Sequence, residues 1–100
     1  MNTIRIDGPP TRWDYARKAQ WIARCEKLGL EVEAPTLPEL HVKIRVALNA
    51  YFQLRFRTGD LPAILRENGW RADPPLPDDI PRTAPDFDVP FALGDSEPAR

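Results

Sequence analysis

The sequence predicts an α+β fold in which a small antiparallel sheet packs on one long helix, followed by a short helix and a proline-rich acidic tail. Three observations support this fold class. Apolar and polar residues alternate in residues 3–7 and 28–34, as in half-buried strands. From Leu37 to about Phe56 the apolar residues instead recur every three or four positions. Beyond Trp70 lie seven of the 12 prolines. We therefore predict a folded domain over residues 1–70 and a tail over residues 71–100.

Two strands are predicted directly from alternation. Residues 3–7, TIRID, alternate isoleucine with polar residues and end at GPP, whose prolines cannot continue a hydrogen-bonded ladder. Residues 28–34, LGLEVEA, place leucine and valine on one face and Glu31 and Glu33 on the other. This second pattern is typical of a half-buried antiparallel strand.

The segment between these strands, TRWDYARKAQWIARCEKLG, fits two structures. Thr11 could cap a helix, several of the residues that follow are helically spaced, and Gly29 would end it. With a period of two, Trp21, Ala23 and Cys25 instead share one face of a strand. Periodicity alone leaves both structures open for Trp21 to Glu26.

Two helices have clear start signals. Thr36 is followed three residues later by Glu39, which predicts a capping box at the start of the long helix. A second, shorter helix is expected to start near Asp60, with Pro62 in its first turn and Gly69 as its stop.

Charge is unevenly distributed along the chain. The net charge is -1, which offers no global electrostatic reason to bind nucleic acid or an anionic membrane. Residues 1–70 hold 11 basic and 8 acidic side chains, whereas residues 71–100 hold 3 and 7. A single cysteine excludes an internal disulfide, and no apolar run approaches the ~20 residues that cross a bilayer. We expect a soluble cytoplasmic protein that does not bind membranes.

The tail contains one more regular pattern. FDVPFAL alternates, with Phe87, Val89, Phe91 and Leu93 on one side. Pro90 points the other way and lacks a donor N–H, which suits a strand at the edge of a sheet. An edge strand is therefore predicted at residues 87–93.

A family resemblance lies in WIARCEKLGLEVEAPTLPELHVKIRVALNAYF. An aromatic residue opens a short strand of the form W-x-A-x-C, a second strand follows, and T-L-x-E-L opens a helix. The residues that match are Trp21, Ala23 and Cys25, then Thr36, Leu37, Glu39 and Leu40. This order resembles the core of the HicB-like antitoxin family over about residues 19–56. The later GDLPAILRENGW is similar to a short helix ending in Gly-Trp that some members contain.

The resemblance implies a β-β-β-α core akin to part of an RNase H fold. It makes Ala19 to Glu26 a strand, paired with the strand at residues 28–34, with Trp21, Ala23 and Cys25 facing the helix. It also makes PPTRWDYARKA a long connection with one or two helical turns.

The function that the resemblance implies is non-enzymatic: an antitoxin that binds and neutralises a small basic mRNA-cleaving toxin. Homodimers or higher homo-oligomers are expected. The chain departs from the family in lacking any recognisable DNA-binding segment, which puts DNA binding in doubt. The alternative is a stand-alone protein-interaction module, such as a phage-encoded one, with the same fold and no toxin partner.

Residues able to carry chemistry are few. His41 and Cys25 have no partner at ligand or catalytic spacing, so each is expected to be structural. Asp7, Asp14, Glu31 and Glu33 invite comparison with nuclease carboxylates, but solvated strand charges are the favoured interpretation. We predict no catalytic residue, no cofactor and no metal.

Aromatic residues exceed what a core of this size needs. Some are therefore expected at a partner interface, where tryptophan and tyrosine are favoured. The predicted partner-interface residues are Trp13, Phe56, Trp70, Phe87 and Phe91.

Overall fold

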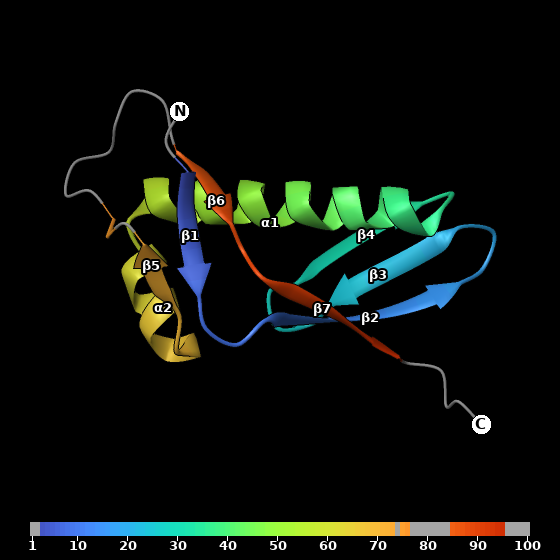
Figure 1. Cartoon of the computed structure of the whole chain (residues 1–100), viewed down its shortest axis with the longest axis horizontal. Helices are drawn as coiled ribbons and strands as arrows, with labels where there is room; N and C mark the ends of the chain where they lie inside the picture. The colour runs from blue at the N-terminus through green and yellow to red at the C-terminus, as the bar shows by residue number, and fades with distance from the viewer. Residues whose placement is uncertain (1–2, 74, 77–84, 96–100) are drawn as a thin grey trace. The chain divides into compact units, whose positions relative to one another are not determined.

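The structure is a computed structural model that describes residues 3–73, 75–76 and 85–95. It confirms the α+β class, with two sheets, a long helix and a short one (Figure 1). The chain runs β1 (Thr3–Asp7), β2 (Thr11–Arg17), β3 (Trp21–Cys25), β4 (Leu30–Ala34), α1 (Leu37–Thr58), α2 (Leu61–Asn68), β5 (Arg71–Asp73), β6 (Asp86–Asp88) and β7 (Phe91–Asp95). The rest of the predicted tail lies outside the described residues.

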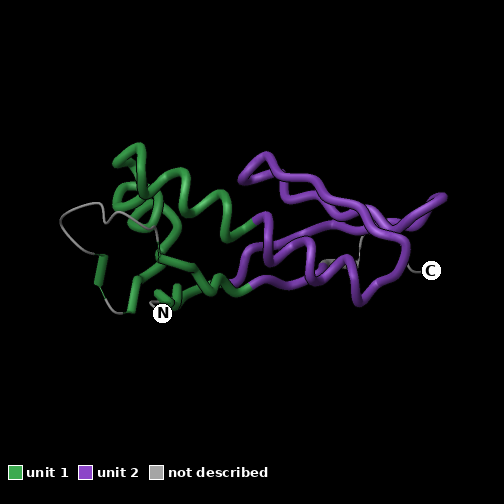
Figure 2. Tube along the Cα trace, turned by 90° about the horizontal axis from the view of Figure 1, so that it is seen from above, with its two compact units in different colours: residues 1–9, 48–90 green, residues 10–47, 91–100 purple. Residues whose placement is uncertain are grey.

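Two compact units make up the chain (Figure 2). Unit 1 comprises residues 1–9 and 48–90, and unit 2 comprises residues 10–47 and 91–100. Each unit therefore combines residues from both sides of position 70. Helix α1 contributes its first part to unit 2 and its second part to unit 1.

Unit 2 is built on a four-stranded sheet in the order β4-β3-β2-β7. The pairs β2·β3 and β3·β4 are antiparallel, and β7 joins β2 in parallel. One face is buried with α1 and the other is exposed, so the strands alternate as half-buried strands should. The fully buried side chains include Trp13, Ala23, Cys25, Ala34, Leu40 and Ile44.

The segment that fitted two structures is a strand. Trp21–Cys25 forms β3, with Ala23 and Cys25 buried and Trp21 half-buried on the same face, as predicted. The predicted connection with helical turns at PPTRWDYARKA is wrong, because Thr11–Arg17 forms β2. Thr11 and Trp13 point into the core, where the Trp13 indole Nε1 donates to Thr11 Oγ1 at 3.0 Å. Thr11 and Trp13 share a face because side chains in a strand alternate with a period of two. The same segment also contains helically spaced residues, so the sequence alone did not reveal this period.

Unit 1 contains a three-stranded sheet in the order β5-β1-β6. Strand β1 pairs antiparallel with β5 and parallel with β6. Ile4, Ile6 and Phe87 are buried on one face of this sheet. Phe52 of α1 lies in van der Waals range of two other rings, with centroids 5.6 Å from Trp70 and 5.7 Å from Phe87. The core of unit 1 therefore contains a cluster of aromatic rings among aliphatic side chains.

The helix start signals are confirmed with one difference in detail. The Glu39 backbone N–H donates to Thr36 Oγ1 at 3.3 Å, as a capping box requires. The Thr36 hydroxyl itself donates to Glu39 Oε1 at 2.9 Å. At the second helix, Asp60 makes no side-chain cap hydrogen bond, and Gly69 ends α2 in the left-handed conformation. Each helix thus begins and ends close to its predicted residues.

The FDVPFAL alternation is divided between two strands. Asp86–Asp88 is the edge strand β6 of one sheet, and Phe91–Asp95 is the edge strand β7 of the other. Val89 and Pro90 lie between them, because Pro90 has no N–H to extend a ladder. The single edge strand predicted over residues 87–93 is therefore two edge strands. Strand β5 was not anticipated in the tail.

Candidate protein-binding surfaces

The outer face of the β5-β1-β6 sheet carries six charged side chains. Because Ile4, Ile6 and Phe87 point inward, the residues that alternate with them are exposed on the other side. We call this surface the acidic face; it comprises Arg5, Asp7, Arg71, Asp73, Asp86 and Asp88. Four carboxylates against two guanidinium groups give it a net charge of -2.

Arg5 is at the centre of the acidic face. In register it lies opposite Asp73 on β5 and Asp88 on β6. Its Nε is 3.0 Å from Asp7 Oδ1 and its Nη2 is 3.2 Å from Asp73 Oδ2. Among the described residues, no cation lies within 4.0 Å of the Asp88 carboxylate. Arg5 therefore forms ion pairs with Asp7 and Asp73, and Asp88 has no ion pair with any residue that the structure describes.

A shallow hollow of about 220 Å³ adjoins Asp88 in unit 1. It is lined by Arg5, Ile6, Asp7, Gly8, Asp88 and Pro90. Gly8, at φ 140°, lies under Trp70: a Cβ there would be 2.7 Å from the Gly69 carbonyl oxygen. The Trp70 indole Nε1 also donates to the Pro9 carbonyl at 2.7 Å. These contacts fix the end of β1 beside the hollow.

The outer face of the β4-β3-β2-β7 sheet carries charges of both signs. Asp14, Arg24 and Glu31 lie in one row across three strands. Arg24 Nε is 3.5 Å from Glu31 Oε1. A hollow of about 300 Å³ follows this row and is lined by Asp14, Tyr15, Ala16, Lys18, Ile22, Arg24, Glu26 and Glu31. Paired charges of opposite sign make this surface less selective for the charge of a partner than the acidic face.

Candidate catalytic residues are dispersed. Cys25 is buried in β3, and His41 packs edge-on against the Phe91 ring with centroids 5.9 Å apart. Among the described residues, no group of three or more His, Cys, Asp or Glu side chains is arranged to hold a metal ion. Glu31 is ion-paired with Arg24, and Glu33 lies beside Ile22 one row further along the sheet. Of these nuclease-like carboxylates, Asp14 and Glu31 line one hollow, with Arg24 between them in the row.

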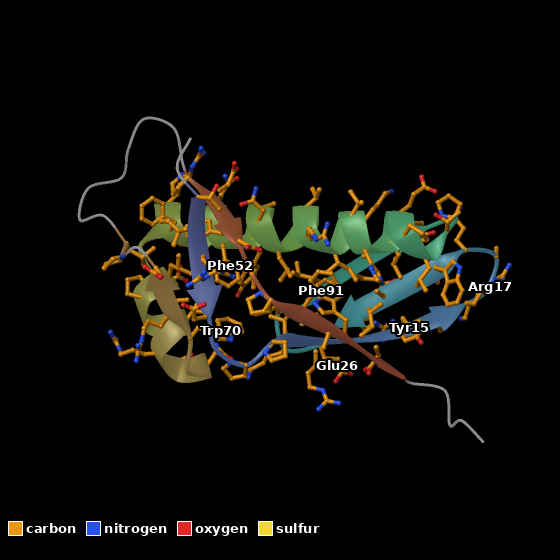
Figure 3. All side chains as sticks on the ribbon, viewed as in Figure 1. Tyr15, Arg17, Glu26, Phe52, Trp70 and Phe91 are labelled. Atoms are coloured by element: carbon orange, nitrogen blue, oxygen red, sulfur yellow. The ribbon has the colours of Figure 1, made fainter. Side chains whose placement is uncertain are left out.

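The predicted partner-interface aromatics lie mostly inside the chain. Trp13, Phe56, Trp70 and Phe87 are buried, and Phe91 is half-buried. Figure 3 shows Phe52 beside Trp70 and Phe91 below α1. A partner would reach the four buried rings only if the core opened. Their role at an interface remains a prediction, and the surfaces described here consist of exposed residues.

Among the residues that the structure describes, one carboxyl group has a displaced pKa. The pKa of Asp60, in the turn between α1 and α2, is lowered, chiefly because the Thr58 hydroxyl donates to its carboxylate. Arg55 Nη1 lies 3.1 Å from Asp60 Oδ2 and acts in the same direction. These contacts connect the end of α1 to the start of α2. The lowered pKa of Asp60 is therefore explained by contacts that hold the turn between the helices.

Comparison with protein families, curated proteins and solved structures gave no match. The surfaces must therefore be interpreted from their own chemistry. No helix in the described part of the chain is long and apolar enough to cross a membrane.

The acidic face was not predicted from the sequence because its residues come from three strands far apart in the chain. The signal that could have found it is the spacing of charged residues in DFD and RAD, which puts both charges of each strand on one side.

Proposed function

We propose that the protein is a non-enzymatic, HicB-like antitoxin-type protein that binds and neutralises a small basic mRNA-cleaving toxin. The acidic face carries the proposal. A ribonuclease that binds RNA needs a basic surface, because phosphate contacts from lysine and arginine supply most of the affinity. A preformed acidic surface on the antitoxin would compete with the RNA backbone for that site.

The way in which the acidic face is built supports this role. Its carboxylates project from paired strands, so a partner need not order a loop to meet them. Asp86 is further held by Asn49 Nδ2, which donates to its Oδ1 at 3.3 Å. Asp88 lies opposite Arg5 but makes no ion pair with it, so its carboxylate can pair with a lysine or arginine of the toxin. The resemblance of residues 19–56 to HicB-like antitoxins points to the same class of partner.

The direct test is co-expression with the product of the adjacent gene. We expect this chain to co-purify with a small basic protein and to relieve its toxicity. Asp73→Asn combined with Asp88→Asn should weaken the complex by about tenfold or more at low salt, since each lost charge pair contributes about 1 kcal/mol. The fold should persist, because surface ion pairs contribute little to stability.

A matched control removes two carboxylates elsewhere. Glu33→Gln combined with Glu67→Gln changes the net charge equally but leaves the acidic face intact. This control should bind and rescue like the unchanged chain. If both double variants weaken binding equally, only net charge matters and the acidic face is not the binding site.

The alternative, a stand-alone interaction module, predicts a different outcome from the same experiment. Such a module would bind a protein partner without relieving any toxicity. Recruitment of no small basic protein, together with no rescue, would contradict the antitoxin proposal. Homo-oligomerisation is part of the proposal, and light scattering on the purified chain measures it.

A further inference from the structure

Strand β7 has an open backbone edge. It pairs in parallel with β2 along five residues, from Thr11 opposite Phe91 to Tyr15 opposite Asp95. It is last in the sheet order, and among the described residues no strand pairs with its other side. No described side chain of α1 hydrogen bonds to its backbone. An edge of this kind is a template for another extended chain.

Most of the usual protective devices are lacking in β7. Its sequence, FALGD, has no lysine and no proline, its one charged residue is Asp95 at the end of the strand, and its register with β2 is uninterrupted by a bulge. Ala92, on the exposed face of the sheet, is too small to shield the edge. An added strand can therefore approach β7 without displacing a large side chain on that face.

At the Phe91 end of this edge, cations lie on both faces of the sheet, whereas Asp14 lies opposite Gly94 further along the strand. On the helix side, the Arg45 guanidinium lies 6.0 Å from the centre of the Phe91 ring. On the exposed side, Arg12 of β2 lies directly opposite Ala92. Among the described residues, neither arginine has a carboxylate within 4.0 Å. Neighbouring strands are about 4.8 Å apart, so an extended Arg12 side chain can reach across Ala92 towards an added strand.

We propose that the β7 edge binds an extended segment of a partner protein in which apolar residues alternate with acidic ones. The backbone of that segment would pair with β7. Its apolar side chains would pack beside Phe91 and Leu93, both half-buried. Its acidic side chains, which alternate onto the exposed face, would pair with Arg12. This surface belongs to unit 2, is distinct from the acidic face in unit 1, and does not depend on the proposed antitoxin role.

The test uses the full chain and two synthetic peptides. One is a capped peptide of alternating leucine or valine and glutamate, and the other has lysine in place of every glutamate. Fluorescence anisotropy should show the glutamate peptide binding about tenfold more tightly than the lysine peptide. Arg12→Glu should weaken binding of the glutamate peptide by about threefold to fivefold. Arg45→Glu, on the helix side where the apolar side chains of the peptide lie, should weaken it by less than about twofold. Lys43→Glu, an equal charge change on an exposed position of α1, should leave binding within about twofold.

Hydrogen exchange locates the bound peptide independently of affinity. Added glutamate peptide should slow amide exchange in β7 while exchange in β4, the opposite edge, is unchanged. Protection at β4, or equal binding of the two peptides, would overturn the proposal. Protection of β7 that rises with protein concentration in the absence of peptide would also overturn it, because the occupant would then be a second copy of this chain.

Discussion

Strands β6 and β7 both lie at sheet edges and follow each other in the chain (Figure 1). Among the described residues, side chains of helix α1 hydrogen bond to the backbone at β6 but not at β7. On β6, Asn49 Oδ1 accepts from the Phe87 backbone N–H at 2.7 Å. Gln53 Nε2 donates to the carbonyl of Pro85, just before the strand, at 2.9 Å. On β7 the corresponding helix residues, His41 and Arg45, contact the Phe91 ring instead.

The difference lies in side-chain chemistry and not in spacing. Asn49 and Gln53 are four residues apart on α1, and so are His41 and Arg45. A side-chain amide carries both a donor and an acceptor, so it can replace a missing strand. An imidazole edge and a guanidinium plane pack on an aromatic ring and leave the backbone free. Helix α1 thus satisfies two backbone groups at the β6 edge and, among the described residues, none at the β7 edge.

The largest expected difference between the two strands is in stability, and it is measured by replacing one phenylalanine in each. Phe87 is buried between Phe52 and Phe56, with the Phe56 centroid 6.1 Å away, so Phe87→Ala should lower the free energy of unfolding by about 3–5 kcal/mol. Phe91 is half-buried, and Phe91→Ala should cost about 1–2 kcal/mol. Urea denaturation followed by circular dichroism measures both. Equal losses would mean that β7 is as closely packed as β6.

A second test removes the side-chain amides that hydrogen bond to the backbone at β6. Asn49→Ala removes the acceptor for the Phe87 N–H and should cost about 1–3 kcal/mol, because a partly buried donor is left unsatisfied. Amide exchange at Phe87 should become faster. Gln53→Ala removes one bond to a carbonyl and is the milder comparison, at about 0.5–1.5 kcal/mol. An Asn49→Ala chain with unchanged exchange at Phe87 would show that the amide does not protect the edge.

The smallest expected effect is a pH-dependent contribution of Asp60 to the stability of unit 1. Asp60 belongs to unit 1, and its pKa is lowered mainly by the hydrogen bond from Thr58. A carboxyl with a lowered pKa stabilises the fold above its ordinary pKa of 3.8, and this contribution is lost as the pH falls through the lowered value. The stability difference between the unchanged chain and Asp60→Asn should therefore be present at pH 7 and shrink below about pH 4. A difference that does not change with pH would mean that Asp60 acts through its shape and not its charge.

Much of the local structure was predictable, because local signals agree with the fold. The capping box at Thr36 and Glu39, the stop at Gly69 and the alternation of Leu30, Val32 and Ala34 each describe one element. Strand β3 could be assigned only with help from its neighbours. Strand β2 was mistaken for a connection, since Thr11–Arg17 also contains helical spacing and nothing local reveals that Trp13 is fully buried.

The surfaces were less predictable, because they depend on pairings between distant strands. The acidic face needs β1 between β5 and β6, and the flanking cations of β7 need Arg12 opposite Ala92. Neither register follows from composition or periodicity. The division of FDVPFAL at Val89 and Pro90 likewise sends Phe87 and Phe91 to two different sheets.

These long-range registers also set the order in which the chain can fold. Thr3 pairs with Asp86 and Thr11 with Phe91, so neither sheet is complete until the last strands have been synthesised. The hairpins of β2, β3 and β4 and the two helices involve near neighbours and can form first. Strand β1, by contrast, must wait for β5 and β6 while the ribosome adds most of the chain. During that interval its two isoleucines are exposed, and a nascent chain stalled before residue 86 would be the form most in need of a chaperone.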